Sequence, residues 1–238
     1  LLSDYTINGD FTVTSGDFQI NSDDASTILN LTVYGDVAVQ SNGSITTGEG
    51  DTRAGYQIGG TMPADDGKNY HDIFHQFNIY GDFINRGTVR FTNQDAPVYN
   101  SFPDDGAVTV RFQGASNNTM DLYNTTDFYN LIIDKGTDKT YKLNVYSADT
   151  DHLTLFGANN VGRTSGGAFT SEDPQVRKAL WIYHGTLQLR GQIEIPTLSE
   201  GSQEGGNGDY AVGKSARLWI DGNNVRVYST ANAVDEIT

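Results

Sequence analysis

A seven-residue pattern recurs near the start of the chain and restricts the fold more than any other feature of the sequence. A large apolar residue is followed by a polar, an aliphatic and a variable residue, then Gly, Asp and an apolar residue, in segments 5–11, 31–37 and 77–83. Looser copies begin at Leu153 and Leu218, and a second short strand follows a second glycine at Gly43, Gly87 and Gly185. Short alternating runs that end in tight corners and repeat along a chain predict a solenoid of stacked coils.

A second repeat suggests how the coils stack. The tetrapeptide Thr-Val-Arg-Phe occurs at 88–91 and again at 109–112, an offset of 21 residues that is about the length of one solenoid coil. One coil cannot bury its apolar face alone, so we expect successive coils to stack with like residues in register. This register predicts two pairs of inward neighbours, Val89 near Val110 and Phe91 near Phe112.

These patterns predict an all-β protein in which residues 1–238 form a single right-handed parallel β-helix segment with loop insertions, its handedness taken from the general rule for parallel crossovers. We expect the insertions at 48–69, 157–174 and 199–209, which are rich in Gly, Ser, Asp and Glu. Segment 171–180 permits either a short helix or a loop that enters a strand. An antiparallel β-sandwich is the alternative fold, because it also consists of short strands and turns.

Composition excludes several classes of function. The chain has 30 acidic and 15 basic residues and a formal net charge of −15, which repels phosphate backbones and anionic lipids, so we expect no nucleic acid partner. No run approaches the roughly 20 apolar residues of a membrane span, so we expect no membrane insertion. The absence of cysteine excludes disulfides and thiol catalysis. Calcium remains a candidate cofactor because oxygen ligands are abundant, but no known calcium-binding repeat marks a site.

Three segments carry a resemblance to a known group of proteins: FNIYGDFINRGTVRFTN at 77–93, FYNLIIDKG at 128–136 and IPTLSEG at 195–201. Together with the repeat, over residues 31–229, they resemble very large surface adhesins of Bacteroidota that are built from long β-helical stretches and exported by the type IX secretion system. The resemblance implies a secreted or outer-cell-surface location, contact with secretion or gliding machinery, and neighbouring coils from a longer parent chain.

Catalytic and metal-binding motifs are weak in this sequence. His71 and His75 are spaced as in a zinc-protease helix, but the residues that follow them predict a strand, in which positions four apart lie about 13 Å from each other. Paired acids occur at Asp23-Asp24, Asp65-Asp66, Asp104-Asp105 and Asp149 with Asp151. β-Helical polysaccharide lyases and glycosidases use paired acids, yet Asp beside Gly is also what turns select. We therefore expect these acids to lie in turns.

Aromatic residues at outward or corner positions are the candidate ligand-binding residues: Tyr34, Tyr80, Trp181, Tyr183 and Trp219. Exposed rings with neighbouring hydroxyl and amide groups can stack on sugars, but the same rings can instead be packed under the insertions. The predicted register also places Arg90 beside Arg111 on the outside. Two guanidinium groups so close require acids or a bound anion between them.

The sequence therefore favours a non-enzymatic extracellular segment that acts as an adhesin or a rigid stalk and contacts polysaccharide or another surface. A carbohydrate-active β-helix enzyme is the alternative, and a segment that only spaces other domains is a third. The open edges of the first and last coils are expected to pair with further coils, since an unpaired parallel edge is a template for association.

Overall fold

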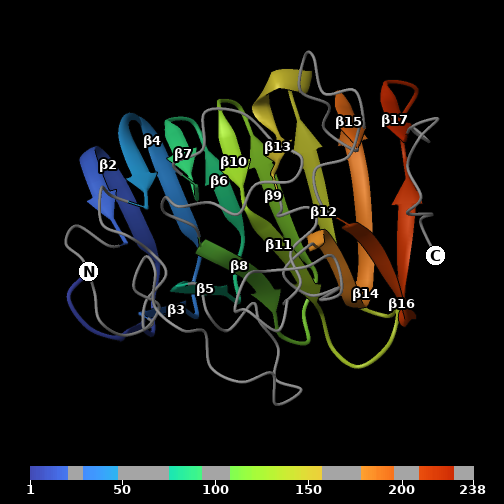
Figure 1. Ribbon diagram of the computed structural model, residues 1–238, viewed down its shortest axis with the longest axis horizontal. Coiled ribbons are helices and arrows are strands. Elements are labelled where there is room, and N and C mark those ends of the chain that lie inside the picture. Colours follow the sequence, from blue (N-terminus) through green and yellow to red (C-terminus); the bar gives the residue numbers. More distant parts are fainter. Residues whose placement is uncertain (21–28, 48–74, 93–107, 157–177, 196–208, 228–238) are drawn as a thin grey trace, which may run out of the picture.

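The computed structural model describes residues 1–20, 29–47, 75–92, 108–156, 178–195 and 209–227. Most of these residues lie in strands that wind into a solenoid, as Figure 1 shows. Successive turns of the chain stack by parallel pairing, which gives seven described coils. Each coil places strands on three faces, which we name A, B and C in the order in which the chain visits them.

Face A contains β1 (Tyr5–Ile7), β3 (Asn30–Val33), β5 (His75–Ile79), β8 (Val108–Gln113), β11 (Asn130–Asp134) and the first parts of β14 (Lys178–Gly191) and β16 (Asp209–Ile220). Face B contains the first parts of β2 (Phe11–Gln19) and β4 (Val37–Thr46), then β6 (Phe83–Asn85), β9 (Asn118–Leu122), β12 (Lys142–Ser147) and the second parts of β14 and β16. Face C contains the second parts of β2 and β4, then β7 (Thr88–Arg90), β10 (Thr126–Phe128) and β13 (Thr154–Leu155), the last preceded by the 3-10 turn η2 (Thr150–His152). In the last two coils β15 (Ile193–Ile195) and β17 (Val225–Val227) follow face B and pair with each other.

Every strand pair in the described part of the chain is parallel, including those on all three faces. The predicted parallel β-helix is therefore confirmed, and the antiparallel sandwich is wrong for these residues. Within the same residues, no helix has the length and hydrophobicity that a membrane crossing requires. The predicted insertions lie outside the described residues, except that Asp209 begins β16.

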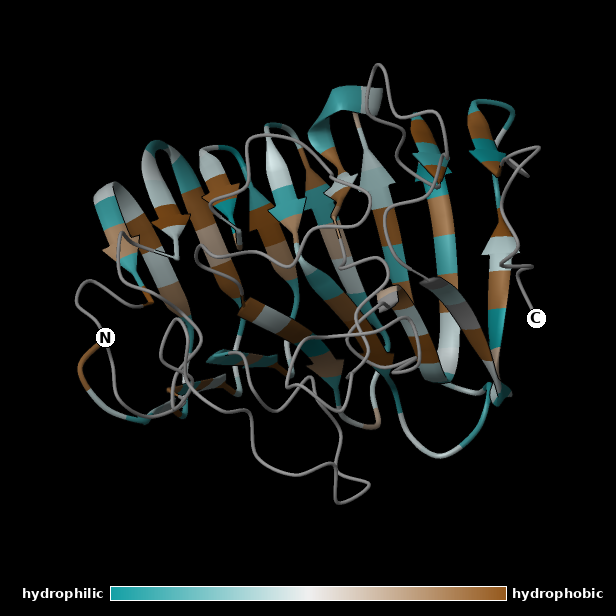
Figure 2. Ribbon diagram, viewed as in Figure 1, coloured by the Kyte–Doolittle hydropathy of each residue, from teal (hydrophilic) through white to brown (hydrophobic). Residues whose placement is uncertain are grey.

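The core is built from rows of inward-facing side chains. Leu31, Phe77, Val110, Leu131 and Leu180 occupy one register position on successive coils and are at most 3 % exposed. Figure 2 shows the resulting alternation of brown and teal bands along the strands. Full burial of each such side chain contributes about 1.5–3 kcal/mol, so the stacked rows supply most of the favourable energy of the fold.

The Gly-Asp pairs of the repeated pattern form the corner between faces A and B. The Oδ1 atom of Asp10 accepts the backbone N–H of Asp36 at 2.9 Å, and Oδ1 of Asp36 accepts that of Asp82 at 2.8 Å. Oδ1 of Asp82 in turn accepts the N–H of Thr119 at 2.9 Å. Each carboxylate thus ties one coil to the next where the corner interrupts the strand ladder. The register Tyr5–Leu31 is the one that the repeated pattern predicts.

The stacking predicted from the Thr-Val-Arg-Phe repeat is wrong. Val89 lies on face C and pairs with Ile45 and Thr126, whereas Val110 lies on face A and belongs to the core row described above. The two copies are consecutive strands on different faces, so Phe91 and Phe112 are not register partners either. One coil does span 21 residues, but it is the coil that begins at Thr109, whose register partner on the next coil is Asn130.

The two looser copies of the pattern also occupy other positions than predicted. Leu153 precedes β13 on face C, and Leu218 lies in the face B part of β16. Neither copy is in register with the face A strands that carry the first three. The helix considered for 171–180 lies largely outside the described residues, and its last three residues begin β14, in agreement with the reading of a loop that enters a strand.

Candidate functional site

The five aromatic residues predicted as ligand-binding lie at three separate places. Tyr34 and Tyr80 stack at the end of face A in the second and third coils, with ring centroids 4.6 Å apart. Trp181 and Tyr183 lie on face A of β14, with ring centroids 4.8 Å apart. Trp219 lies on face B of the last coil. Tyr34, Tyr183 and Trp219 are 51 %, 43 % and 41 % exposed, so each of the three places presents a ring to solvent.

At the first place one of the two tyrosines is packed against neighbouring side chains of the coils, and packing under the predicted insertions stays a prediction because they lie outside the described residues. The hydroxyl of Tyr80 lies 3.1 Å from Oε1 of Gln113 and donates to it, and the amide of Gln113 donates to Oδ1 of Asn78 at 2.7 Å. Burial and the neighbouring Tyr34 raise the pKa of Tyr80. Tyr80 is therefore a supporting ring held by an amide network, and Tyr34 is the ring that remains accessible.

The second place adjoins a group of charged side chains centred on Asp134. Its Oδ2 lies 3.3 Å from Nη1 of Arg111, and its Oδ1 lies 2.8 Å from Nδ1 of His184. The His184 ring is 4.1 Å from that of Tyr183. The aromatic pair Trp181–Tyr183 therefore has a fixed polar border, which is the combination that a sugar-binding surface requires.

Arg90 and Arg111 are not neighbours, which corrects the predicted register on the outside of the helix. Arg90 lies on face C, where its Nε is 2.9 Å from Oδ2 of Asp127, and Arg111 lies on face A beside Asp134. Burial raises the pKa of Asp127, while the hydrogen bond from Arg90 lowers it. Each arginine thus has its own acidic partner. Because the two arginines do not lie side by side, no bound anion is needed between them.

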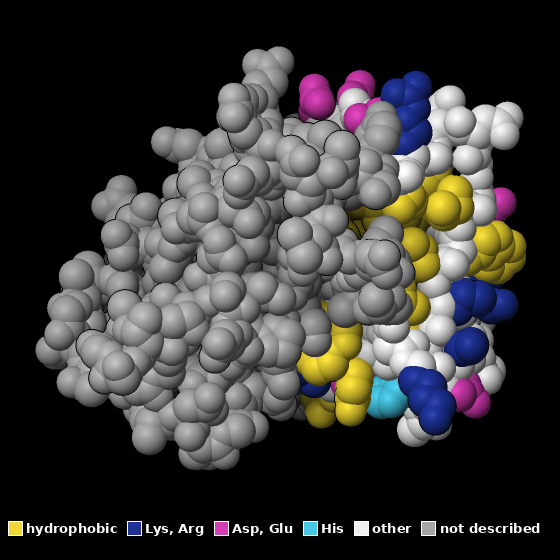
Figure 3. All heavy atoms as spheres, turned by 45° about the vertical axis from the view of Figure 1, so that its right-hand side comes forward, with side chains coloured by type: hydrophobic (Ala, Val, Ile, Leu, Met, Phe, Trp, Pro, Cys, Tyr) yellow, Lys and Arg dark blue, Asp and Glu magenta, His cyan; other side chains and the backbone are white. Residues whose placement is uncertain are grey.

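Trp219 is the centre of the third place and has two cations beside its ring. Nζ of Lys142 lies 5.5 Å from the ring centroid and Cζ of Arg217 lies 5.7 Å from it. Nζ of Lys142 also donates to Oε1 of Gln188 at 3.2 Å, and Nε2 of Gln188 donates to Oδ2 of Asp221 at 2.6 Å. We call these five residues the Trp219 patch. Figure 3 shows Lys and Arg side chains next to hydrophobic ones at this end of the molecule.

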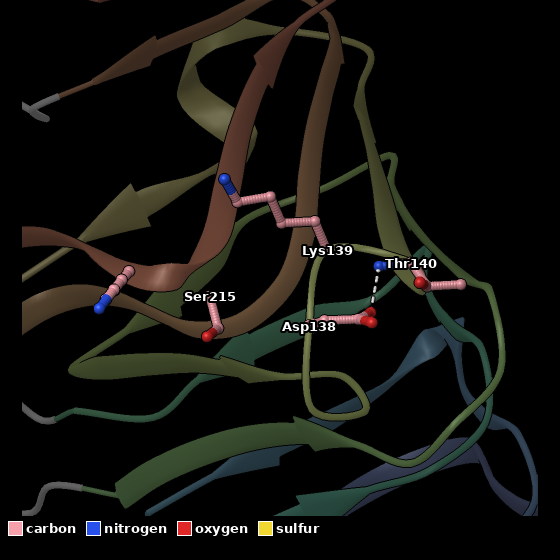
Figure 4. Close-up of a pocket in the computed structure, with 5 residues that line it drawn as sticks. Asp138, Lys139, Thr140 and Ser215 are labelled. Atoms are coloured by element: carbon pink, nitrogen blue, oxygen red, sulfur yellow. Dashed lines mark hydrogen bonds between the residues drawn. The ribbon is translucent and has the colours of Figure 1, made fainter.

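A shallow pocket of about 470 Å³ adjoins the Trp219 patch at the corner between faces A and B, lined by Asp138, Lys139, Thr140, Lys214 and Ser215. Figure 4 shows Asp138 and Lys139 on one loop with their side chains in different directions, and Ser215 on a facing strand. Asp138 Oδ1 accepts the backbone N–H of Thr140 at 2.8 Å, and hydrogen bonds from the Thr140 side chain and backbone lower the pKa of Asp138. Two lysines and two hydroxyl side chains thus line the pocket beside an acid already engaged by its own loop.

A buried lysine lies inside the same corner. Nζ of Lys135 donates to the backbone oxygen of Gln113 at 2.6 Å and to Oδ1 of Asn118. The Asn118 amide donates to Oδ1 of Asp82 at 3.2 Å, so the ammonium and the carboxylate are linked through one side chain. Burial lowers the pKa of Lys135 to about 8, although the Asp82 charge opposes this. This network links the coils at the corner, and only its lysine is fully buried.

The histidines and acids considered for catalysis have structural contacts. His75 is buried at the start of β5, and its Nδ1 accepts the N–H of Leu29 at 2.8 Å; His71 lies outside the described residues. Among the described residues, no group of three or more His, Asp or Glu side chains is placed to hold a metal ion. Asp149 Oδ1 accepts the N–H of Asp151 at the start of η2, so this acid pair lies in a turn as predicted. The other paired acids lie outside the described residues.

Sequence reasoning missed the cations around Trp219 and a third aromatic pair. The rings of Tyr123 and Tyr146 lie 6.1 Å apart at the end of face B, with Cζ of Arg86 4.9 Å from the Tyr123 centroid. Arg217 could have been found, since it is two residues before Trp219 in a strand and shares its face. Lys142 had no such signal, because only the stacking of two further coils brings it to Trp219.

Comparison of the chain with protein-family models, with curated protein sequences and with solved structures finds no match. The site is therefore interpreted from its own chemistry.

Proposed function

We propose that the protein is a non-enzymatic, extracellular β-helix segment that acts as a cell-surface adhesin or rigid stalk and makes contact with polysaccharide. The observation that carries the proposal is the set of exposed rings on the outside of a solenoid whose polar groups are otherwise largely paired. Tyr34, Tyr183 and Trp219 are each more than 40 % exposed and each borders fixed polar groups. An exposed ring with polar groups beside it can stack on a sugar and hydrogen-bond its hydroxyl groups.

The spacing of the rings supports a multivalent mode of binding. They lie on two faces and at three positions along the axis, so that no single pocket gathers them. Individually weak contacts of this kind add up when a long polymer engages several of them, because each later contact is intramolecular. A stack of parallel coils suits this role, since each coil is held by its neighbours and the distances between the rings stay constant.

The proposed location is the outer cell surface or the secreted fraction, and the proposed partners are secretion or cell-surface machinery and neighbouring coils of a longer chain. Support for the location is the resemblance of three segments to type IX-secreted adhesins of Bacteroidota. Support for the neighbouring coils comes from the last described coil, in which the inward-facing Ile220 is 47 % exposed. Antibodies against this chain that label intact cells of the source organism would support the location, and labelling only after lysis would overturn it.

A carbohydrate-active enzyme remains the second candidate because of one observation on face B. Burial and the nearby Asp82 raise the pKa of Asp121, and Arg190 and Arg86 lie close enough to oppose this. A pair of carboxyl groups in different protonation states is what glycosidases use. Against catalysis, Oδ1 of Asp82 already accepts bonds from Thr119 and Asn118, as described above.

A glycan array on the purified chain, with and without calcium, tests the proposal. Reducing-sugar and unsaturated-product assays would be run on every glycan that binds. Binding without turnover is the expected result. Turnover that is lost in Asp121→Asn would establish the enzyme instead, and a chain that binds no glycan would leave only the stalk.

A further inference from the structure

The Trp219 patch and its pocket carry a charge opposite to that of the whole chain. Residues 1–52 contain no Lys or Arg, and the net charge of the chain is −15. Among the described residues around Trp219, in contrast, five cations accompany three acids: Lys139, Lys142, Arg190, Lys214 and Arg217 with Asp121, Asp138 and Asp221. A local excess of positive charge on an otherwise acidic protein attracts anions to that one part of the surface.

The stacking of the last three coils brings these cations together. On face B, Lys142, Thr186 and Arg217 form one row across β12, β14 and β16, and Asn144, Gln188 and Trp219 form the adjacent outward row. Neighbouring parallel strands are about 4.8 Å apart, so the backbones at Lys142 and Arg217, two strands apart, are separated by roughly 10 Å. The side chains of both residues reach the ring of Trp219. The result is a flat ring with a cation from each of two coils beside it.

The acids of the patch offset only part of this positive charge. Asp138 is engaged by its own loop, and Asp221 accepts the short bond from Gln188 and lies 4.0 Å from Arg190. Lys142 and Arg217 lie near the outer limit of about 6 Å for a cation–π contact, which at an exposed ring contributes only about 0.5–1 kcal/mol. A carboxylate or sulfate group could therefore engage either cation at little cost.

We propose that the Trp219 patch and its pocket bind an acidic polysaccharide, in which a sugar ring stacks on Trp219 and carboxylate or sulfate groups contact Lys142, Arg217 and the pocket lysines. This inference rests on the proposed function and adds the ligand class and the place where it binds. A polysaccharide fits better than a nucleic acid. Duplex DNA carries one charge per about 1.7 Å, and the −15 charge of the chain repels so dense a polyanion.

The test compares polygalacturonate, alginate and chondroitin sulfate with the neutral polymers dextran and laminarin and with single-stranded DNA, by calorimetry at about 0.05 M and about 0.5 M salt. Trp219→Ala should weaken binding of the acidic polymers about tenfold or more, as expected for the loss of a central aromatic contact, and Trp219→Phe should retain much of it. Arg217→Gln should weaken binding mainly at low salt.

Two variants serve as matched controls. Tyr5→Ala removes an aromatic residue of the first coil that is 59 % exposed and lies in none of the three candidate places, and Arg226→Gln removes an exposed arginine of the last coil that pairs with Glu194 at 3.0 Å. Neither should change affinity for acidic polymers more than about twofold, which is the usual effect outside a hot spot. Circular dichroism would show that each variant is folded.

The outcomes separate this inference from the function on which it rests. Binding of acidic polymers that falls in Trp219→Ala but not in the controls supports both. Binding of neutral polymers alone, or binding that is lost in Trp181→Ala and kept in Trp219→Ala, overturns the assignment of the patch but leaves the adhesin. Preference for single-stranded DNA overturns the ligand class. Binding of no polymer overturns the assignment of the patch and the contact with polysaccharide, and leaves only the stalk.

Discussion

Replacing Gly81 by alanine should destabilise the protein, whereas the same change at Gly9 should not. Both glycines occupy the same position of the repeated pattern, at the corner between faces A and B. The β-carbon at this position points to the preceding coil, so at Gly81 it would lie 2.2 Å from the backbone oxygen of Gly35 and 2.6 Å from Oδ1 of Asp36. At Gly9 it would meet no atom within 4 Å.

The cost follows from how far the corner must move. The contact at 2.2 Å would have to open to at least 3.0 Å, and the atom in the way is backbone that cannot rotate aside. This movement also pulls on the 2.8 Å bond from the N–H of Asp82 to Asp36. Overpacking costs about 1–3 kcal/mol and a weakened charge-assisted bond adds about 1 kcal/mol, so we expect a loss of about 3 kcal/mol. Gly9→Ala should gain up to about 1 kcal/mol through lower entropy of the unfolded chain.

Urea unfolding followed by circular dichroism measures both free energies, and the thermal midpoint of Gly81→Ala should fall by roughly 6–12 °C for a chain of this length. The dependence of the free energy on urea concentration should be unchanged, which would show that the variant still folds to the same extent. Equal stabilities of Gly81→Ala and Gly9→Ala would refute the stacked corner.

Three further predictions test other parts of the structure. Asn85→Leu should lower the free energy of unfolding, measured with urea, by about 3 kcal/mol, because the buried Nδ2 donates to Thr126 Oγ1 at 2.8 Å and to two backbone oxygens. Asn144→Leu should lower it less, since Oδ1 of Asn144 lacks a hydrogen-bond partner in the described structure. Burial lowers the pKa of Lys135 to about 8, so the unfolded chain binds more protons between pH 8 and 10.5, and wild type should gain unfolding free energy relative to Lys135→Met as the pH rises through that window. The chain should self-associate through its open coils, and Ile220→Lys should reduce the mass measured by light scattering; a wild-type monomer would contradict this.

Much of the fold could be predicted because its corners recur along the sequence. The Gly-Asp pairs at 35–36 and 81–82 repeat because each glycine leaves no room for a β-carbon and each Asp bonds the next coil. Each of these coils imposes the same requirements on the same two residues, so they appear in the sequence as a repeated pattern. The buried alternation of the strands appears as a pattern too, because successive residues point to opposite faces.

The register of the remaining coils could not be predicted from local similarity. Segments 88–91 and 109–112 are identical because any strand with one buried face can use the same alternation, whichever face of the helix it occupies. Which strand stacks on which depends on the length of chain between face C of one coil and face A of the next. That length varies from coil to coil, since Phe77 pairs with Val110 but Thr109 pairs with Asn130.

The candidate site divides in the same way between sequence and structure. The sequence by itself determined the strands, the corners, the acidity of the chain and the aromatic residues at outward positions, since these depend on composition and on neighbours along the chain. Only the tertiary structure decided that Tyr80 is packed on Gln113, that Arg90 and Arg111 have separate acidic partners, and that Lys142 lies beside Trp219. Parallel stacking joins residues one or more whole coils apart, and no spacing along the chain records that contact.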